Sequence, residues 1–225
     1  MPNSGIDALL SVNNLTRLGQ GLAVTLKLSI ISIAISLALG LIYGIAMTTK
    51  NKLLYGLLKL YLEAFRVIPL LVWLFLLFFG GARAFGADTD GFTASVIVFS
   101  MWGTVEMGDI IRGAVQSIPA CQRLSAEALG MTKARIYRHV IIPQAVRRFT
   151  PAAINLVTRM IKTSSLAVFV GVTEILRVGK QIIEFNMMKN PMASFWIYAF
   201  IFVVYFIICY PVSRLSKRLE AKWEY

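Results

Sequence analysis

Long apolar runs alternate with short polar segments along this chain of 225 residues. Five of the runs are long enough to cross a bilayer, whose hydrocarbon core needs about 20 helical residues. The first run is free of charge from residue 28 onward and the last carries no charge, whereas the middle three contain ionisable side chains. The pattern predicts an all-α polytopic membrane protein, with helices expected over residues 21–49, 57–79, 92–115, 151–172 and 191–213.

A polar segment over residues 117–143 separates the third apolar run from the fourth. Pro119 suits the start of a helix, and Gly130 suits a helix end in the left-handed conformation. Thr132 can cap a second short helix, which we expect to end before Pro143. The helix pair is basic and amphipathic, so it cannot lie in hydrocarbon. It must face water, where its apolar side contacts either a partner protein or the lipid interface.

The composition agrees with a membrane protein, because 57% of the residues are hydrophobic and only 15% are charged, against about 25% in soluble domains. The net charge is +12, and the basic residues gather after the first, third and fifth apolar runs. The other two loops, near residues 80–90 and 174–189, carry both signs of charge. Because basic residues concentrate on the cytoplasmic side, we expect the N-terminus outside and the C-terminus in the cytosol. The same rule explains the basic excess without a nucleic-acid partner.

The first apolar run carries a stripe of small residues at helical spacing, which lets two helix backbones approach closely. The stripe consists of Ser29, Ser32, Ser36, Gly40 and Gly44. Packing within the chain is the favoured interpretation, and a contact between two subunits is the alternative.

The spacing from Gly130 to residues 140–143, which read VIIP, resembles the EAA signature of ABC importer permeases. Aligned on Gly130, Leu124 takes the position of the family's Glu, and Glu127 is the nearest acid. Three further motifs occur in order: YLEAFRVIPLL at 61–71, DIIRGAVQSIP at 109–119 and IKTSSLAVFVGVTEI at 161–175. Together they make nearly the whole chain similar to the polar amino acid subfamily of these permeases.

The resemblance implies one transmembrane domain over residues 1–225, acting as the permease subunit of an importer in the bacterial inner membrane. The partners that it implies are a second permease subunit, identical or different, two P-loop ATPases, and a periplasmic or lipid-anchored amino acid-binding protein. The chain has no P-loop of its own, because Glu174 stands where the first Gly before Gly179-Lys180 would be. We therefore expect a non-enzymatic subunit without a cofactor or metal, with ATP and Mg²⁺ bound by the ATPases.

By the same resemblance, the segment 117–143 is a coupling segment on which the ATPases dock. The residues that we expect at this contact are Leu124, Glu127, Ala128, Gly130, Met131, Arg135, Arg138 and Pro143. Closure of the ATPase pair would move the segment, tilt the third and fourth helices, and open the path to the opposite side of the membrane.

Ionisable residues inside membrane spans are functional candidates, because hydrocarbon does not solvate charge. Glu63 and Arg66 are three residues apart, as are Asp109 and Arg112, so each pair can form an ion pair within one helix. A structural role is favoured for both pairs, and a place in the translocation path is the alternative.

Glu106, Arg159 and Lys162 have no obvious partner at helical spacing. A cation inside the membrane suits the α-carboxylate of an amino acid, the hydroxyls that follow Lys162 can hydrogen-bond, and Glu106 can accept the α-ammonium. The family motif usually has Asp at Thr163, so its absence favours acidic or neutral polar amino acids such as glutamate, aspartate or glutamine. The substrate-binding candidates are Glu106, Arg159, Lys162, Thr163, Ser164, Ser165, Arg66 and Asp109.

Other function classes fit the chain less well. A membrane-embedded enzyme needs clustered acids or a nucleophile beside a base, and the acids of this chain are scattered. A secondary transporter usually has inverted repeats and more spans. The main alternative is the same importer fold carrying a cationic amino acid or another small polar solute.

Overall fold

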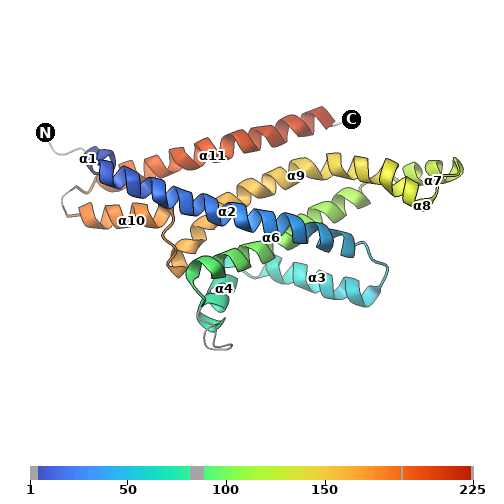
Figure 1. The fold of residues 1–225 in the computed structure, drawn as a ribbon, viewed down its shortest axis with the longest axis horizontal. Helices are drawn as coiled ribbons and strands as arrows, with labels where there is room; N and C mark the ends of the chain where they lie inside the picture. The colour runs from blue at the N-terminus through green and yellow to red at the C-terminus, as the bar shows by residue number, and fades with distance from the viewer. Residues whose placement is uncertain (1–4, 82–88, 189, 224–225) are drawn as a thin grey trace. The chain divides into compact units, whose positions relative to one another are not determined.

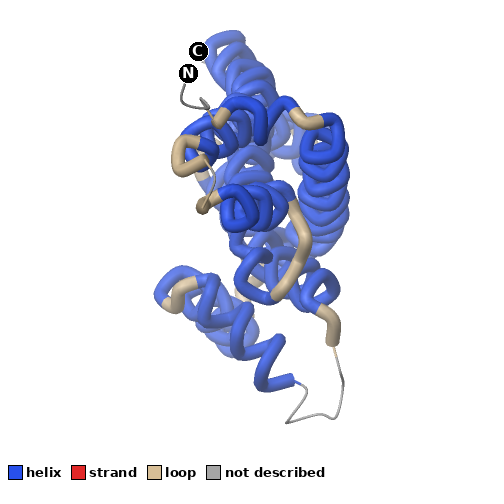
Figure 2. The backbone as a smooth tube through the Cα atoms, turned by 90° about the vertical axis from the view of Figure 1, so that its left-hand side faces the viewer, coloured by secondary structure: helices blue, strands red, loops and turns tan. Residues whose placement is uncertain are grey.

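The computed structural model describes residues 5–81, 89–188 and 190–223, so the loop charges Arg83, Asp88 and Lys189 lie outside the described residues. All regular structure within these ranges is helical (Figures 1 and 2), which confirms the expected all-α class. The elements are α1 (Ile6–Leu10), α2 (Val12–Ala46), α3 (Lys52–Val67), α4 (Leu70–Phe75), the π-helical turn η1 (Leu76–Gly80), α6 (Gly91–Gln116), α7 (Ala120–Ala128), α8 (Lys133–Ile136), the π-helical turn η2 (Tyr137–Ile141), α9 (Ile142–Thr163), the 3₁₀ segment η3 (Ser164–Val170), α10 (Ile175–Asn186) and α11 (Ala193–Trp223).

Four of the described helical stretches are long and apolar enough to cross a membrane, and a fifth results if α3, α4 and η1 are taken together. The four are α2, α6, Lys133–Val170 and α11. This agrees with the expected number of about five transmembrane helices. The helix predicted over residues 92–115 agrees most closely with the structure, where it is α6. Asp90 caps the start of α6 by accepting hydrogen bonds from the Phe92 and Thr93 N–H groups.

The second apolar run is not one helix. α3 ends at Val67, and α4 begins at Leu70. The ring of Pro69 disfavours helical geometry at the residue before it, and Ile68 accordingly has an extended backbone with φ −85° and ψ 127°. The apolar pattern over 57–79 did not reveal this break, because the residues on both sides of it are equally apolar.

The second short helix of the polar segment does not end before Pro143, which corrects the sequence-based expectation. α8, η2 and α9 follow one another without a gap, and Pro143 is the second residue of α9. Pro143 has no N–H to donate, and the wider turn of η2 accommodates this, because the Ile142 N–H bonds to the Tyr137 carbonyl. The polar segment and the fourth apolar run therefore belong to one helical stretch.

The chain divides into two compact units. The first unit comprises Met1–Ser32, Leu70–Phe99 and Arg159–Pro211. Its interior holds one apolar cluster that includes Leu28 and Ala167 and another that includes Ile182 and Ile197, all fully buried. These clusters fix the course of the chain on either side of η3.

The second unit comprises Ile33–Pro69, Ser100–Thr158 and Val212–Tyr225. Within it, α2 and α6 approach closely at Gly44 and Gly108, since a Cβ atom on Gly44 would lie 2.8 Å from the Gly108 carbonyl oxygen. Ser36 Oγ donates to the Ser100 carbonyl at 3.3 Å in the same contact. This end of the small-residue stripe therefore packs within the chain, as the favoured interpretation predicted.

We predict that Gly108→Val destabilises the protein, because a Cβ atom there would lie 2.3 Å from the Tyr43 ring and 3.0 Å from the Gly44 nitrogen. Overpacking of this kind lowers the free energy of unfolding by about 1–3 kcal/mol or more. Gly113→Val is the matched control, because it lies on the same helix with no atom within 4 Å of its added Cβ. Thermal unfolding in detergent measures both, and equal melting temperatures for the two variants would contradict the packing described.

Candidate functional site

Helix α7 ends just before Gly130, as the sequence predicts. The backbone of Gly130 is in the left-handed conformation, with a φ of 75°. The Gly130 N–H bonds to the Glu127 carbonyl at 2.9 Å, and the Met131 N–H bonds to the Ala126 carbonyl at 3.1 Å. Thr132 occupies the N-cap position of α8, but its side chain makes no capping hydrogen bond. α7 and α8 thus meet at a defined turn that requires a left-handed residue.

The two faces of this helix pair differ in exposure. Ala126 and Ile136 are buried in an apolar cluster with Ile118 and Ile141. The opposite face is open, and Leu129 at the turn is 82% exposed. Of the expected docking residues, Met131 is half-buried, and the exposed ones are Leu124, Glu127, Ala128, Gly130, Arg135, Arg138 and Pro143. The segment therefore presents a mixed apolar and basic surface that its own chain does not cover.

Asp109 is the centre of an ion-pair cluster in the second unit. It accepts hydrogen bonds from Arg112 on α6, at 3.0 Å from Nε and 2.6 Å from Nη2, and from Arg66 on α3. Arg112 also donates to the Gln116 side chain at 2.7 Å. The expected pair of Asp109 with Arg112 is confirmed, and the contact with Arg66 ties α3 to α6.

The expected pair of Glu63 with Arg66 is replaced by this contact. Arg66 pairs with Asp109, which lies 43 positions further along the chain, and Glu63 forms no ion pair within the described part of the chain. Helical spacing alone cannot reveal such a partner, because the contact depends on how α3 packs against α6. The Asp109 cluster has two cations for one acid, so it retains a positive charge.

Arg159 and Lys162 lie on one side of α9, one turn apart, and both are exposed. Hydrocarbon does not accommodate such a pair, so this side must face water or another protein chain when the helix spans a membrane. Thr163, the last residue of α9, is half-buried beside them. This side of α9 carries two exposed cations, which can attract a carboxylate.

The hydroxyl groups of the two serines after Thr163 donate hydrogen bonds to backbone carbonyls of the preceding turn. Ser164 is buried, and its Oγ donates to the Ile161 carbonyl at 2.7 Å. Ser165 Oγ donates to the Lys162 carbonyl at 2.8 Å. Here the α-helix changes to the 3₁₀ segment η3, which ends at Gly171 with φ 86°. The hydroxyl groups of these serines are therefore engaged with the backbone at the point where the helix geometry changes.

Glu106 lies on α6, one turn before Asp109, and is half-buried. It belongs to the second unit, with Arg66 and Asp109, whereas Arg159, Lys162, Thr163, Ser164 and Ser165 belong to the first. The structure thus brings the substrate-binding candidates together in two groups.

The Gly179-Lys180 pair lies within the helix α10 and not in a phosphate-binding loop. The start of that helix is occupied by the Glu174 carboxylate, which accepts hydrogen bonds from the Leu176 N–H at 2.9 Å and the Arg177 N–H at 2.7 Å. Glu174 is fully buried, and this burial raises the pKa of its carboxyl group. A phosphate group cannot use these donors while the carboxylate holds them.

Residues 18–225 match the family described as "Binding-protein-dependent transport system inner membrane component". The chain belongs to this family of ABC importer permeases, whose assemblies include ATPase subunits and a binding protein. A permease subunit is a transport component and not an enzyme, since ATP is hydrolysed by the partner subunits.

The relatives of this chain place it among permeases for amino acids. It is 33% identical to the probable amino-acid permease protein YxeN of Bacillus subtilis (strain 168), over 89% of this chain and 88% of the relative. It is 31% identical to the glutamine transport system permease protein GlnP of Escherichia coli (strain K12), over 90% and 91% of the two chains. A crystal structure of an amino acid ABC transporter with histidines superposes with a TM-score of 0.85 at 29% identity, covering 95% and 97% of the two chains. The chain is therefore an amino acid permease subunit of an ABC importer.

We predict that Asp109→Asn lowers the melting temperature, because Arg66 and Arg112 then lose their shared acid. Hydrogen bonds to charged groups contribute about 1.5–3 kcal/mol each. Glu127→Gln is the control, because the Glu127 contact to Arg123 is 3.9 Å long and its side chains are 44% and 59% exposed. Exposed pairs of this kind contribute about 1 kcal/mol or less.

Asp109→Glu keeps the negative charge but lengthens the side chain. We expect this variant to retain most of the stability that Asp109→Asn loses. Unfolding of the purified variants in detergent gives the comparison. If Asp109→Asn were as stable as Glu127→Gln, the cluster would not hold α3 to α6.

Proposed function

We propose that this protein is the permease subunit of a bacterial inner-membrane importer for acidic or neutral polar amino acids. The observation that best supports this substrate class is the exposed pair of cations, Arg159 and Lys162, followed by Thr163. Two cations attract the carboxylates of the substrate, and Thr163 supplies no negative charge for a cationic side chain at the position where the family motif has Asp. The relative named as a glutamine permease is consistent with this substrate class.

The assembly that we propose contains two permease subunits, identical or different, and two P-loop ATPases that bind ATP and Mg²⁺. A periplasmic or lipid-anchored binding protein delivers the amino acid. The chain forms one transmembrane domain with its N-terminus outside and its C-terminus in the cytosol, an orientation supported by the basic residues after α2, after α6 and in the C-terminal part of α11. The cationic side of α9 then faces the substrate path and not the lipid.

Coupling follows from the continuity of one helix. The docking residues Arg135 and Arg138 and the substrate candidates Arg159 and Lys162 lie on the uninterrupted stretch Lys133–Val170. A displacement of α7 and α8 by the ATPases therefore moves the helix that carries the cations. Rigid movements of this kind can expose a site to each side of the membrane in turn. In this proposal, α7 and α8 transmit the movement of the ATPases to the membrane span. The α-helical geometry of that stretch is interrupted at η2 and η3.

Transport in proteoliposomes tests the proposal. The permease is reconstituted with its partner ATPase and binding protein, and uptake of labelled glutamine, glutamate, histidine and arginine is measured with and without internal ATP. We expect ATP-dependent uptake of glutamine or glutamate. Transport without ATP, or no uptake of any amino acid by an active complex, would contradict the proposal.

A cationic amino acid is the second candidate, because the solved relative at 29% identity is described with histidines. The same uptake panel decides between them. If histidine or arginine outcompetes glutamine, an acid from another part of the path, such as Glu106, takes the role of the Asp that Thr163 replaces.

We predict that Lys162→Ala lowers ATP-dependent uptake about tenfold, because it removes one charge-assisted contact to the substrate carboxylate. Lys162→Arg should retain more activity, since it keeps the charge. Lys217→Ala, at an exposed position on α11, is the control and should transport normally. Uptake rates over a range of substrate concentrations measure the effect, and unchanged kinetics in Lys162→Ala would remove this residue from the site.

We also predict that Gly130→Leu uncouples the ATPase without preventing membrane insertion. The left-handed backbone at Gly130 is strained for leucine, whereas asparagine tolerates it. No atom of the chain lies within 4 Å of a Cβ added there, so intramolecular crowding is not the cause. Substrate-stimulated ATP hydrolysis should fall strongly in Gly130→Leu and much less in Gly130→Asn. Normal stimulation in Gly130→Leu would refute the docking role.

A further inference from the structure

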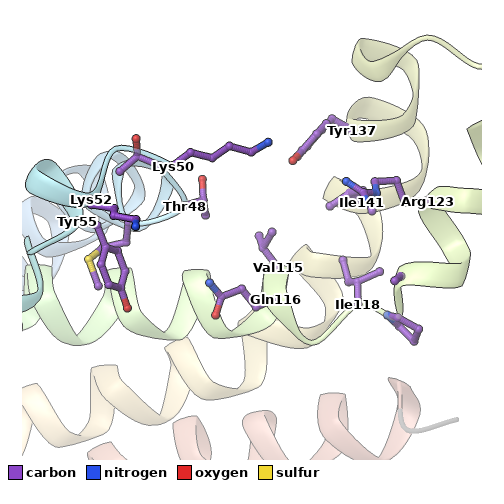
Figure 3. Close-up of a pocket in the computed structure, with 14 residues that line it drawn as sticks. Thr48, Lys50, Lys52, Tyr55, Val115, Gln116, Ile118, Arg123, Tyr137 and Ile141 are labelled. Carbon is purple, nitrogen blue, oxygen red and sulfur yellow. The ribbon is translucent and has the colours of Figure 1, made fainter.

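A cavity of about 530 Å³ lies beside α7 in the second unit. It is formed where the link between α2 and α3 meets the end of α6, the start of α7 and the turn η2. Figure 3 shows Lys50 extending from the link toward Tyr137 on η2, with Gln116 of α6 on another side of the opening. The expected docking residues do not line this cavity, so it is a separate feature of the polar segment.

The charged residues that line the cavity are all cationic. They are Lys50, Lys52 and Arg123. Neither lysine forms an ion pair with any residue in the described ranges, and Arg123 makes a long contact of 3.9 Å with Glu127. Hydroxyl groups of Tyr55 and Tyr137 also line the cavity and can donate hydrogen bonds. The lining therefore offers positive charge and donors to an anion that the chain itself does not supply.

The remaining surroundings are apolar and point to an amphiphilic occupant. Met47, Val115 and Ile118 form part of the lining. Directly after Lys52, α3 presents Leu53 and Leu57, which are 75% and 59% exposed. A free phosphate ion would gain nothing from this surface, whereas a phospholipid has both a charged headgroup and acyl chains.

We propose that the cavity binds the phosphate headgroup of an anionic phospholipid, whose acyl chains lie along the exposed leucines of α3. The cavity lies next to the ends of two spanning helices, α2 and α6, which is where headgroups are found. The bound lipid joins the α2–α3 link to α7 and η2, so it steadies the docking segment against the spans. This inference rests on the proposed function only for its orientation, which places the site in the cytoplasmic leaflet.

Native mass spectrometry of the purified full chain tests the site without ATPase or substrate, so its result is independent of transport. Dioleoylphosphatidylglycerol is titrated into the detergent-solubilised protein, with dioleoylphosphatidylcholine as the uncharged comparison. Each Lys or Arg near an anionic headgroup strengthens binding about fivefold. We expect phosphatidylglycerol affinity to fall about tenfold or more in the triple variant Lys50→Gln, Lys52→Gln, Arg123→Gln.

The matched control removes the same charge from the exposed end of α11, with Lys217→Gln, Arg218→Gln and Lys222→Gln. Its affinity should stay within about twofold of the unaltered protein, because these residues lie outside the cavity. Equal losses in both triple variants, or no loss in the cavity variant, would overturn the proposal, since attraction would then be general or absent. Competition by millimolar glycerol 3-phosphate would also overturn it, because a free phosphate would then suffice. Melting temperatures of the variants establish that they are folded.

Discussion

The absence of water in the hydrocarbon core determines where each charge of this protein can lie. The charged residues of the spanning stretches meet this constraint in two ways. Asp109 is neutralised by Arg66 and Arg112 within the chain, and this requires α3 to lie against α6. Arg159 and Lys162 are instead exposed on one side of α9, so their side of the helix needs water or another chain. Basic residues also gather around the link between α2 and α3, around α7 and α8, and in the C-terminal part of α11. The exposed charges on α9 are therefore the ones that we propose contact the substrate.

Close packing of α2 against α6 fixes the position of the helix that carries Asp109. Gly44 and Gly108 allow α2 and α6 to touch along their backbones, and α6 carries Asp109 one position after Gly108. The helical stretch from Lys133 to Val170 contains both α8 and the cationic side of α9. The π-helical turn η2 before Pro143 and the 3₁₀ segment η3 after Thr163 interrupt the α-helical geometry of this stretch.

Local signals predicted the parts of this structure that depend on neighbouring residues. The apolar run at 92–115 became α6, and Gly130 ended α7 in the left-handed conformation as expected. Contacts between distant segments were not predictable in this way. Arg66 pairs with Asp109 instead of Glu63, because the packing of α3 on α6 offers a better partner than helical spacing does. In the sequence, Pro143 predicts a helix end, but a π-helical turn lets the helix continue past it. The cavity around Lys50 also combines residues from three separate parts of the sequence.

Site-directed cross-linking tests most directly whether the α7–α8 segment receives the ATPase. Leu129→Cys places a thiol at a highly exposed position of the turn, in a protein whose free cysteines Cys121 and Cys209 are replaced by serine. Phe202→Cys, on the exposed apolar side of α11, is the control. With a bifunctional thiol reagent and the co-expressed ATPase, the account predicts an adduct between position 129 and the ATPase, and none from position 202. Absence of the adduct at position 129 in an assembled, ATP-hydrolysing complex would contradict it.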